Sequence, residues 1–313
     1  MSISNIAVII IAKNESKSIE SCLVSIFNQS VKPLEVIVVD GRSTDDTVEK
    51  ARKFPVKILI ESGNTSPSNA RNLGVHNANS DIVLVMGADA ELDQDCIKNA
   101  LKYFEDPNVI VVIPTLQIRI HNRLEEIQRD WFWGTRSRIR TPRGTGSSIQ
   151  FVRKEVYLKV KFDTKIGFGD DSDFRRRMKK MYEGRPEKII KVADSKILVD
   201  LPHSISEMAE QYMWYGRTSL RYYLRYHTWD AILRLGSMLM PSIFFFSFIV
   251  TLAIPKFIYI TIMLFALVII RNLTICIRSG KSNFIEFMLF DLLRSFLYVV
   301  GVFQSIFVKR IGR

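Results

Sequence analysis

The chain has 313 residues, of which 47% are hydrophobic and 24% are charged, and its formal net charge is +12. These proportions are ordinary for a globular protein, and they exclude a disordered tail, a collagen-like fibre and a low-complexity linker. The cysteines Cys22, Cys96 and Cys276 are far apart and form no CxxC pair, which argues against a disulfide framework or a zinc ribbon. The length predicts about two domain-sized units.

Short β-branched runs alternate with amphipathic segments in the first third of the chain. Each run is typical of a strand buried on both faces, and the segments between them have helical spacing of their apolar residues. The expected strands are Ile6–Ala12, Glu35–Asp40, Lys57–Ile60, Asp81–Met86 and Val109–Ile113. This order predicts an α/β fold with a mainly parallel sheet, whose ligands bind at the carboxyl ends of the strands. Asp40 and the segment Gly87–Asp89 fall at that edge.

The middle of the chain is basic. Residues 116–185 hold 18 Lys and Arg but only 9 Asp and Glu. Such a stretch indicates an anionic membrane surface or a phosphorylated substrate, and no nucleic-acid-binding signature accompanies it. Further on, Tyr212–Trp229 holds seven aromatic residues together with a row of arginines at Arg217, Arg221 and Arg225. This pattern predicts an amphipathic helix at the headgroup layer of a membrane, with a soluble packing helix as the alternative.

Three apolar blocks follow, at Leu235–Pro255, Phe257–Ile277 and Phe284–Val308. The first has 21 residues without a charge, and the second reaches spanning length if it includes Arg271. The length of the third block favours three spans. The basic flanks favour two, with the third block as an interfacial or re-entrant helix. We therefore predict two or three spans, against the alternative of a buried hairpin in a soluble protein. The basic flank after the third block consists of Lys309, Arg310 and Arg313.

The start of the chain has no basic segment and no small-residue cleavage site. A signal peptide is therefore not predicted, and the first 234 residues are expected to stay on the cytoplasmic side of a cell membrane that the chain crosses more than once.

Acidic residues gather at three loops where a ligand cleft is expected. They are Glu15 with Asp40, Asp89 with Glu91, and the trio Asp170, Asp171 and Asp173. Carboxylates two residues apart on a loop suit a hard divalent cation, which prefers oxygen ligands. A carboxylate away from the metal can act as a general base.

The succession IIIAKNE, VVDGRSTDDT, NARNLGV…ANSDIVLVMGAD and GFGDDSDFRRRM resembles the family-2 glycosyltransferases, which have the GT-A fold. The resemblance covers about Ile6 to Arg217. It implies a nucleotide-sugar-binding α/β sandwich and inverting transfer of a sugar from a nucleotide diphosphate, with Mg²⁺ or Mn²⁺ as cofactor.

The same resemblance implies roles for individual residues. Lys13 and Glu15 match the loop that meets the nucleotide, Asp40 matches the acid that recognises the base or ribose, and Arg71 matches a position near the donor phosphates. Asp89, beside Ala88, matches the last acid of the DxD motif, which holds the metal. Asp171 matches the catalytic base, and Asp170 replaces the glutamate that precedes it.

The chain departs from the family pattern at Gly87, which replaces the first acid of DxD. Polyprenyl-phosphate sugar synthases of the family place metal ligands at the last Asp and two residues further on, and Asp89 with Glu91 fits that arrangement. The segment Gln211–Tyr215 lacks the Arg-Trp of the QxxRW signature, so a polymerising enzyme is not predicted. His203 is a further candidate for contacting the metal or the pyrophosphate.

The predicted organisation is a GT-A domain at 1–205, an interfacial helix at 206–234 and a membrane domain at 235–313. The predicted function is transfer of a sugar to a hydroxyl of a lipid-linked saccharide or glycolipid. Transfer to polyprenyl phosphate is the first alternative, although that acceptor is already ionised and needs no base. A non-catalytic membrane scaffold that binds a nucleotide sugar is the second. The donor sugar, the base and the oligomeric state are not predicted.

Overall fold

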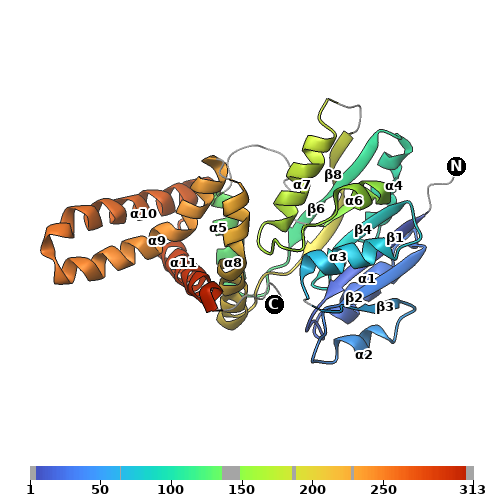
Figure 1. Ribbon diagram of the computed structural model, residues 1–313, viewed down its shortest axis with the longest axis horizontal. Helices are drawn as coiled ribbons and strands as arrows, with labels where there is room; N and C mark the ends of the chain where they lie inside the picture. The colour runs from blue at the N-terminus through green and yellow to red at the C-terminus, as the bar shows by residue number, and fades with distance from the viewer. Residues whose placement is uncertain (1–4, 64, 136–148, 185–187, 227–228, 308–313) are drawn as a thin grey trace. The chain divides into compact units, whose positions relative to one another are not determined.

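The computed structural model describes residues 5–63, 65–135, 149–184, 188–226 and 229–307 (Figure 1). Two compact units are present: the first comprises residues up to 119 together with 140–200, and the second comprises 120–139 together with 201–309. The chain thus contributes one segment of the second unit between two parts of the first. The basic flank at Lys309, Arg310 and Arg313 lies outside the described residues.

The first unit is built on one mixed sheet with the strand order β3-β2-β1-β4-β7-β6-β8-β5. Its strands are β1 (Ile6–Ala12), β2 (Glu35–Asp40), β3 (Lys57–Ile60), β4 (Ile82–Gly87), β5 (Ala90–Leu92), β6 (Val109–Ile118), β7 (Gln150–Arg153) and β8 (Lys188–Val199). β1 to β4 pair in parallel, and so do β6 and β8, whereas β7 runs antiparallel between β4 and β6, and β5 runs antiparallel to β8. The α/β prediction is confirmed.

Helices cover both faces of this sheet, as Figure 1 shows. They are α1 (Ile19–Phe27), α2 (Thr47–Ala51), α3 (Pro67–His76), α4 (Cys96–Leu101), α6 (Lys154–Val160) and α7 (Asp170–Met181), with a short 3-10 turn, η1 (Lys102–Glu105). Alternate residues of β1 face opposite sides: Ile6, Val8 and Ile10 pack in the core cluster that includes α1 and α4, whereas Ala7 and Ile9 pack in the cluster of α3, α6 and α7. The sheet is therefore buried on both faces, as its continuous apolar strands predict.

Sheet register brings three loops together at one edge. Ala12 of β1 pairs with Asp40 of β2, and Ile11 pairs with Gly87 of β4. The loops that follow these strands therefore begin side by side at the carboxyl edge of the sheet. The first turn of α3 lies at the same edge because α3 follows the parallel strand β3.

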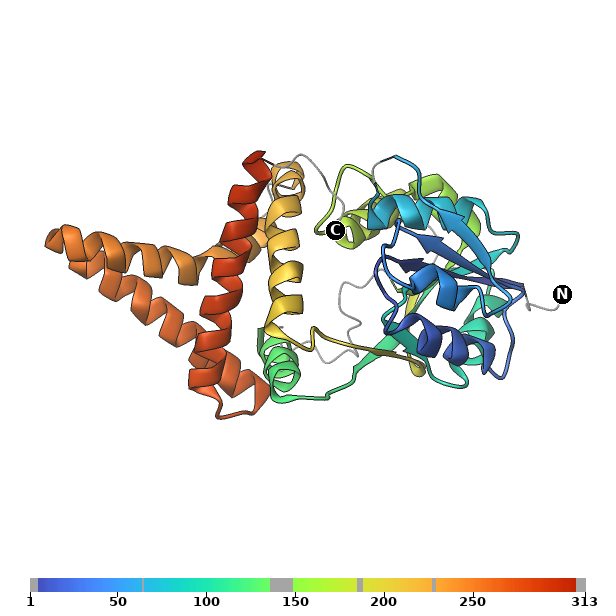
Figure 2. The ribbon, with the colours of Figure 1, turned by 90° about the horizontal axis from the view of Figure 1, so that it is seen from below.

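The second unit is helical. It contains α5 (Arg123–Thr135), α8 (Ile205–Arg225), α9 (Trp229–Ala253), α10 (Ile258–Ser279) and α11 (Phe284–Phe307), with the turn η2 (Pro255–Phe257) between α9 and α10. Figure 2 shows α8 and α11 side by side, running across the hairpin formed by α9 and α10. The predicted aromatic helix ends at Arg225, and a new helix begins at Trp229.

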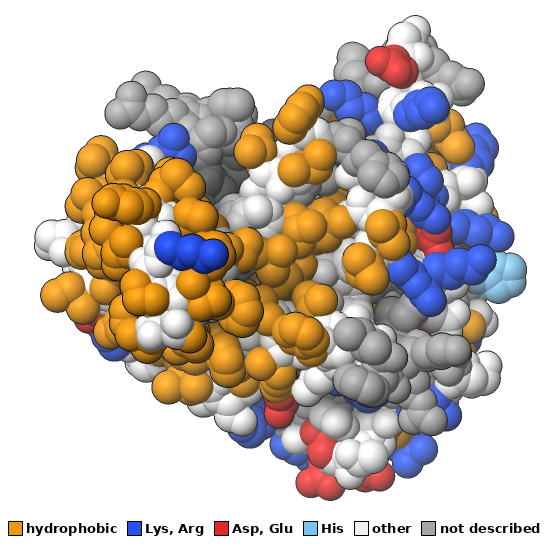
Figure 3. Space-filling model, turned by 60° about the vertical axis from the view of Figure 1, so that its left-hand side comes forward, with side chains coloured by type: hydrophobic (Ala, Val, Ile, Leu, Met, Phe, Trp, Pro, Cys, Tyr) orange, Lys and Arg blue, Asp and Glu red, His pale blue; other side chains and the backbone are white. Residues whose placement is uncertain are grey.

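Two helical segments in the described part of the chain are long and apolar enough to cross a membrane, Leu235–Ala253 and Pro255–Ser279. In the most apolar stretch of each segment, only 6% of the first and 22% of the second is buried inside the protein. The core helices of a soluble fold are mostly buried, so these two segments differ from them. Figure 3 shows the resulting surface, on which hydrophobic side chains cover the α9–α10 hairpin. The third apolar block, which forms α11, is not one of these two segments.

Candidate active site

The loop after β1 is held by side chains from the loop after β2. The backbone N–H groups of Asn14 and Glu15 donate to the hydroxyls of Ser43 and Thr47, each at 2.8 Å. Asp40 is buried, and its two carboxylate oxygens accept from the backbone N–H (3.0 Å) and the hydroxyl (2.5 Å) of Ser43. The predicted nucleotide-contacting residues Glu15 and Asp40 therefore lie in one hydrogen-bonded pair of loops.

Glu61 is a buried acid of this edge that local sequence patterns do not identify. It follows β3, and its Oε1 accepts from the side-chain amide of Asn69 (2.8 Å) and from the backbone N–H of Ser66 (3.2 Å), at the start of α3. Burial raises the pKa of Glu61, although these hydrogen bonds and the nearby cations Lys13 and Arg42 oppose the rise. Glu61 thus links the Lys13 loop to the first turn of α3.

The Asp89 carboxylate occupies the space in which a side chain at position 87 would lie. A Cβ atom on Gly87 would collide with Oδ1 of Asp89, because the Asp89 carboxylate turns back over the glycine. Asp89 is exposed, whereas Ala88 between them is buried in the core. The absence of a side chain at position 87 is therefore what allows the Asp89 carboxylate to occupy this place.

Glu91 is held by an arginine. Its Oε2 lies 2.6 Å from Nη1 of Arg119, and Arg119 also makes two hydrogen bonds, of 2.8 and 2.7 Å, to the carboxylate of Asp200. Burial alone would raise the pKa of Glu91, but the hydrogen bond and charge of Arg119 lower it overall. A metal ion bound by Asp89 and Glu91 would have to compete with Arg119 for Glu91.

The trio of acids lies in the first turn of α7, and two of its members have strong partners. Asp170 is buried, pairs with the guanidinium of Arg71 and accepts from the hydroxyl of Ser68 (2.8 Å). The Asp173 side chain is fully buried and pairs with Arg177 at 2.6 Å. Asp171 is different, because its side chain is 22% exposed and its nearest cation, Arg175, is 3.7 Å away.

The environment of Asp171 changes its acidity. Burial, assisted by the negative charge of Asp170, raises the pKa of Asp171 to about 6, while Arg175 opposes the rise. Arg71, predicted near the donor phosphates, holds Asp170 in place and packs over the Phe162 ring at 4.9 Å. Because α3 carries Ser68 and Arg71, these contacts fix the start of α7 at the carboxyl edge.

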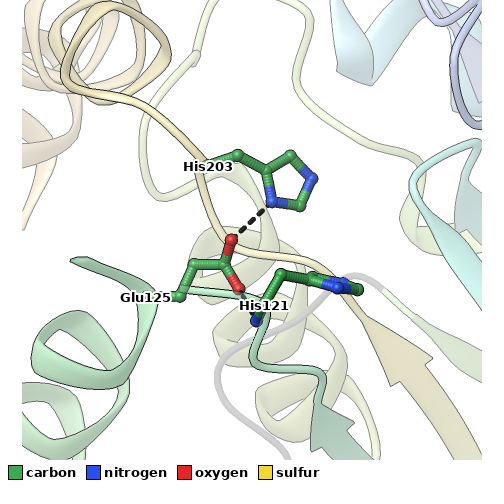
Figure 4. Close-up of side chains that lie close together, drawn as sticks. All are labelled: His121, Glu125 and His203. Atoms are coloured by element: carbon green, nitrogen blue, oxygen red, sulfur yellow. Dashed lines mark hydrogen bonds and ion pairs between the residues drawn. The ribbon is translucent and has the colours of Figure 1, made fainter. Parts of the chain in front are cut away.

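A further group of possible metal ligands lies in the second unit. His121, Glu125 and His203 place ligand atoms within 4.8 Å of one another (Figure 4). Glu125 is buried; it accepts from the backbone N–H of His121 (2.6 Å) and from Asn122 (3.0 Å), and it lies 2.6 Å from Nδ1 of His203. Asn122 in turn accepts from the backbone N–H of Glu125, which is a helix cap at the start of α5. The group can supply three metal ligands, but a metal would displace the His203–Glu125 contact.

The first unit is therefore an α/β domain with acid-bearing loops at the carboxyl edge of its sheet, the position at which such sheets bind nucleotides. Residues 7–160 match glycosyl transferase family 2. The chain thus contains a glycosyltransferase domain of family 2, and the resemblance seen in its motifs is confirmed.

Known proteins of several kinds are similar to this chain. A Methanococcus voltae protein named dolichyl N-acetyl-alpha-D-glucosaminyl phosphate 3-beta-D-2,3-diacetamido-2,3-dideoxy-beta-D-glucuronosyltransferase is 28% identical over 178 residues, which cover 51% of this chain and 53% of that protein. Glycosyltransferase AglE of Haloferax volcanii is 30% identical over 114 residues, which cover 34% and 38% of the two chains. The chain thus matches about half or less of the length of these relatives. The solved structure of S. aureus TarS 1-349 has a TM-score of 0.49 and 21% identity, and the match covers 68% of this chain and 64% of that one.

Proposed function

We propose that the protein is an inverting glycosyltransferase that moves a sugar from a nucleotide diphosphate donor to a hydroxyl of a membrane lipid-linked saccharide or glycolipid. The observation that carries the proposal is the state of the three acids of α7. Asp170 and Asp173 form close ion pairs with arginines of the same unit, whereas Asp171 is partly exposed and has a raised pKa. A carboxylate of this kind suits a base that takes the proton from an acceptor hydroxyl as that oxygen attacks the anomeric carbon.

The donor side is assigned to the loops after β1, β2 and β4. Lys13, Glu15 and Asp40 would contact the nucleotide, and Arg71 would lie near the donor phosphates. Asp89, with Ala88 beside it, is exposed at the same edge and would hold Mg²⁺ or Mn²⁺. When bound, such an ion offsets the charge that develops on the departing diphosphate. Glu91 would join the ion only on release from Arg119.

Because of the helical unit, we assign the acceptor to the membrane. We propose that α9 and α10 cross the membrane, with the first unit on the cytoplasmic side. The name of one relative supports a lipid-linked acceptor, since the Methanococcus protein is named for a dolichyl-linked sugar phosphate. Direct transfer to polyprenyl phosphate remains the competing function. It would leave Asp171 without a proton to remove, because that acceptor is already ionised.

A donor screen tests the proposed function. The full-length protein, reconstituted in membranes, would be incubated with a panel of nucleotide sugars and Mn²⁺, with and without a lipid extract. We expect one donor to release nucleoside diphosphate faster when the lipid extract is present. Binding of a nucleotide sugar without release under either condition would contradict the proposal and favour a non-catalytic scaffold.

Gly87 provides a test of the donor side. We expect Gly87→Ala to lower kcat/KM for the donor by roughly 10- to 100-fold, because the new Cβ displaces the Asp89 carboxylate and small misplacements of a catalytic group have effects of this size. The measurement is initial rates over a range of donor and Mn²⁺ concentrations. Gly236→Ala in α9, where a Cβ would have no atom within 4 Å, is the matched control. Equal activity of the two variants would show that the position of Asp89 is unimportant.

A further inference from the structure

A cluster of charged side chains is buried inside the helical unit. Asp291 and Arg294 of α11 are 0% and 2% exposed, and Arg271 of α10 contacts Asp291 with its Nη1 2.8 Å from Oδ2. Nη2 of Arg294 lies 2.5 Å from Oδ1 of the same carboxylate. Both guanidinium groups also lie over the ring of Trp131 from α5, at 5.4 Å for Arg271 and 4.0 Å for Arg294. We call these four residues the arginine cluster.

The arginine cluster carries an excess of positive charge. Two guanidinium groups share one carboxylate, so its formal charge is +1. The contacts of Arg271 are close but poorly directed, and both of its terminal nitrogens lack a well-oriented hydrogen-bond acceptor, as does Nε of Arg294. Trp131 offsets part of the charge through its ring, but it accepts no conventional hydrogen bond from the arginines. A buried, unbalanced cation with unsatisfied donors is costly, and a further anion would relieve that cost.

The charged pairs around the cluster are nearly balanced, which makes the excess local. Arg123 pairs with Glu126 and Glu286, Arg129 lies 2.8 Å from Asp130, and Lys281 lies 3.6 Å from Asp130, so three cations face three carboxylates. These pairs join α5 to the end of α10 and the start of α11, and most of their members are more exposed than the arginine cluster. Arg271 is the most exposed member of the cluster, with a side chain that is 14% exposed against 2% for Arg294 and 0% for Asp291.

We propose that the arginine cluster binds the phosphate of a lipid-linked acceptor, with Arg271 and Arg294 supplying the positive charge. The chemistry is that of a phosphate joined to an apolar chain, which suits two guanidinium groups beside apolar helices. The proposal rests on the proposed function, because it places the lipid phosphate of the acceptor while the first unit performs the transfer. Asp291 holds the two arginines together and competes with the phosphate for them.

Binding to the full-length protein in detergent tests the proposal without any donor. Farnesyl phosphate is the probe, farnesol tests the chain without phosphate, inorganic phosphate tests the phosphate without a chain, and phosphatidic acid tests an ordinary lipid headgroup. We expect saturable binding of farnesyl phosphate that the other three compounds do not match. Binding of inorganic phosphate or phosphatidic acid with equal affinity would overturn the assignment to an acceptor lipid.

Variants then locate the site. We expect Arg271→Gln to weaken farnesyl phosphate binding at least tenfold and Arg271→Lys to weaken it less, while Arg278→Gln, on an exposed residue of the same helix, leaves it unchanged. Asp291→Asn should tighten binding, because it removes the competing carboxylate. If the role of the cluster is purely structural, Asp291→Asn should weaken or abolish farnesyl phosphate binding. That result would overturn the proposal, and so would equal affinities of the Arg271→Gln and Arg278→Gln variants.

Two further readouts separate the possible failures. Thermal unfolding of each variant shows whether a lost affinity reflects a lost fold, and Arg271→Lys preserves the charge if Arg271→Gln unfolds. Nucleoside diphosphate release from the donor without acceptor is measured on the same samples. Farnesyl phosphate binding with no donor turnover would contradict the proposed function but not the phosphate site. Donor turnover without farnesyl phosphate binding would contradict the phosphate site but not the proposed function.

Discussion

An Asp171→Asn variant is expected to lose transfer to hydroxyl acceptors by roughly 10²- to 10⁴-fold in kcat, the usual contribution of a general base. The substitution keeps the size of the side chain and the acceptor for the Ser172 backbone N–H, which lies 2.7 Å from Oδ1 of Asp171. Donor binding should therefore change little. The measurement is the rate of sugar transfer to a lipid-linked saccharide, with the donor affinity determined in parallel. Full transfer to a sugar hydroxyl by this variant would exclude Asp171 as the base.

Asp170→Asn is the matched comparison. Asp170 is buried and pairs with Arg71, so its replacement removes the negative charge of a buried ion pair and is expected to destabilise the first unit by about 3–5 kcal/mol. Asp171 is less buried, and its ion pair with Arg175 is longer, at 3.7 Å, so its replacement should lower the unfolding temperature much less. The two neighbouring substitutions thus separate loss of a base from loss of a structural ion pair.

The same assignment has a consequence for the dependence of activity on pH. A base acts only in its deprotonated form, and the pKa of Asp171 is raised to about 6. The value of kcat/KM should therefore rise with pH through about 6 and level off above it. An unperturbed aspartate would place that rise near pH 4. Because Asp170 contributes to the raised pKa, Asp170→Asn should shift the rise to lower pH in whatever fraction remains folded.

Local patterns predict those parts of the fold that local interactions determine. β1, β2 and β3 begin and end at the expected residues, because each is a short apolar run between polar loops. β7 was not predicted, since it is only four residues long and its place between β4 and β6 depends on pairing with distant strands. β5, three residues next to the Asp89 turn, escapes detection for the same reason.

Local patterns likewise predict one part of the candidate site and miss the part that depends on distant partners. The parallel order of β1, β2 and β4 predicts that the Lys13, Asp40 and Asp89 loops start together, and the register of the sheet places them so. The pairing of Arg71 with Asp170 joins residues 99 positions apart, and no local pattern indicates it. Glu61 and Arg119 are similar, because the partners of Glu61 at the start of α3 and those of Arg119 at Glu91 and Asp200 are brought near only by the fold. Charge and spacing locate the candidate edge of the sheet, but they do not show which of its charged side chains already pair with one another.

The close packing of α8 against α11 predicts a large effect on stability. Gly216 of α8 and Gly301 of α11 face each other's backbones: a Cβ on Gly216 would collide with the carbonyl oxygen of Tyr298, and one on Gly301 with that of Met213. Neither contact involves a flexible side chain that could move aside. A hydrogen bond of 2.5 Å between Ser219 and Tyr298 ties the two helices at the same crossing. Small residues allow this approach of helix backbones.

Gly301→Leu is therefore expected to destabilise the helical unit by more than about 3 kcal/mol, at the upper end of overpacking effects, because α8 and α11 must separate to admit the side chain. Gly236→Leu, in α9, is the control: a Cβ there has open space around it, so stability should be unchanged or slightly raised. Thermal unfolding and size-exclusion chromatography of the detergent-solubilised proteins measure the difference. Equal unfolding temperatures would mean that α8 and α11 do not pack through these glycines. If Gly301→Leu lowers the unfolding temperature as expected, its donor turnover reports whether the first unit functions without an intact α8–α11 pair.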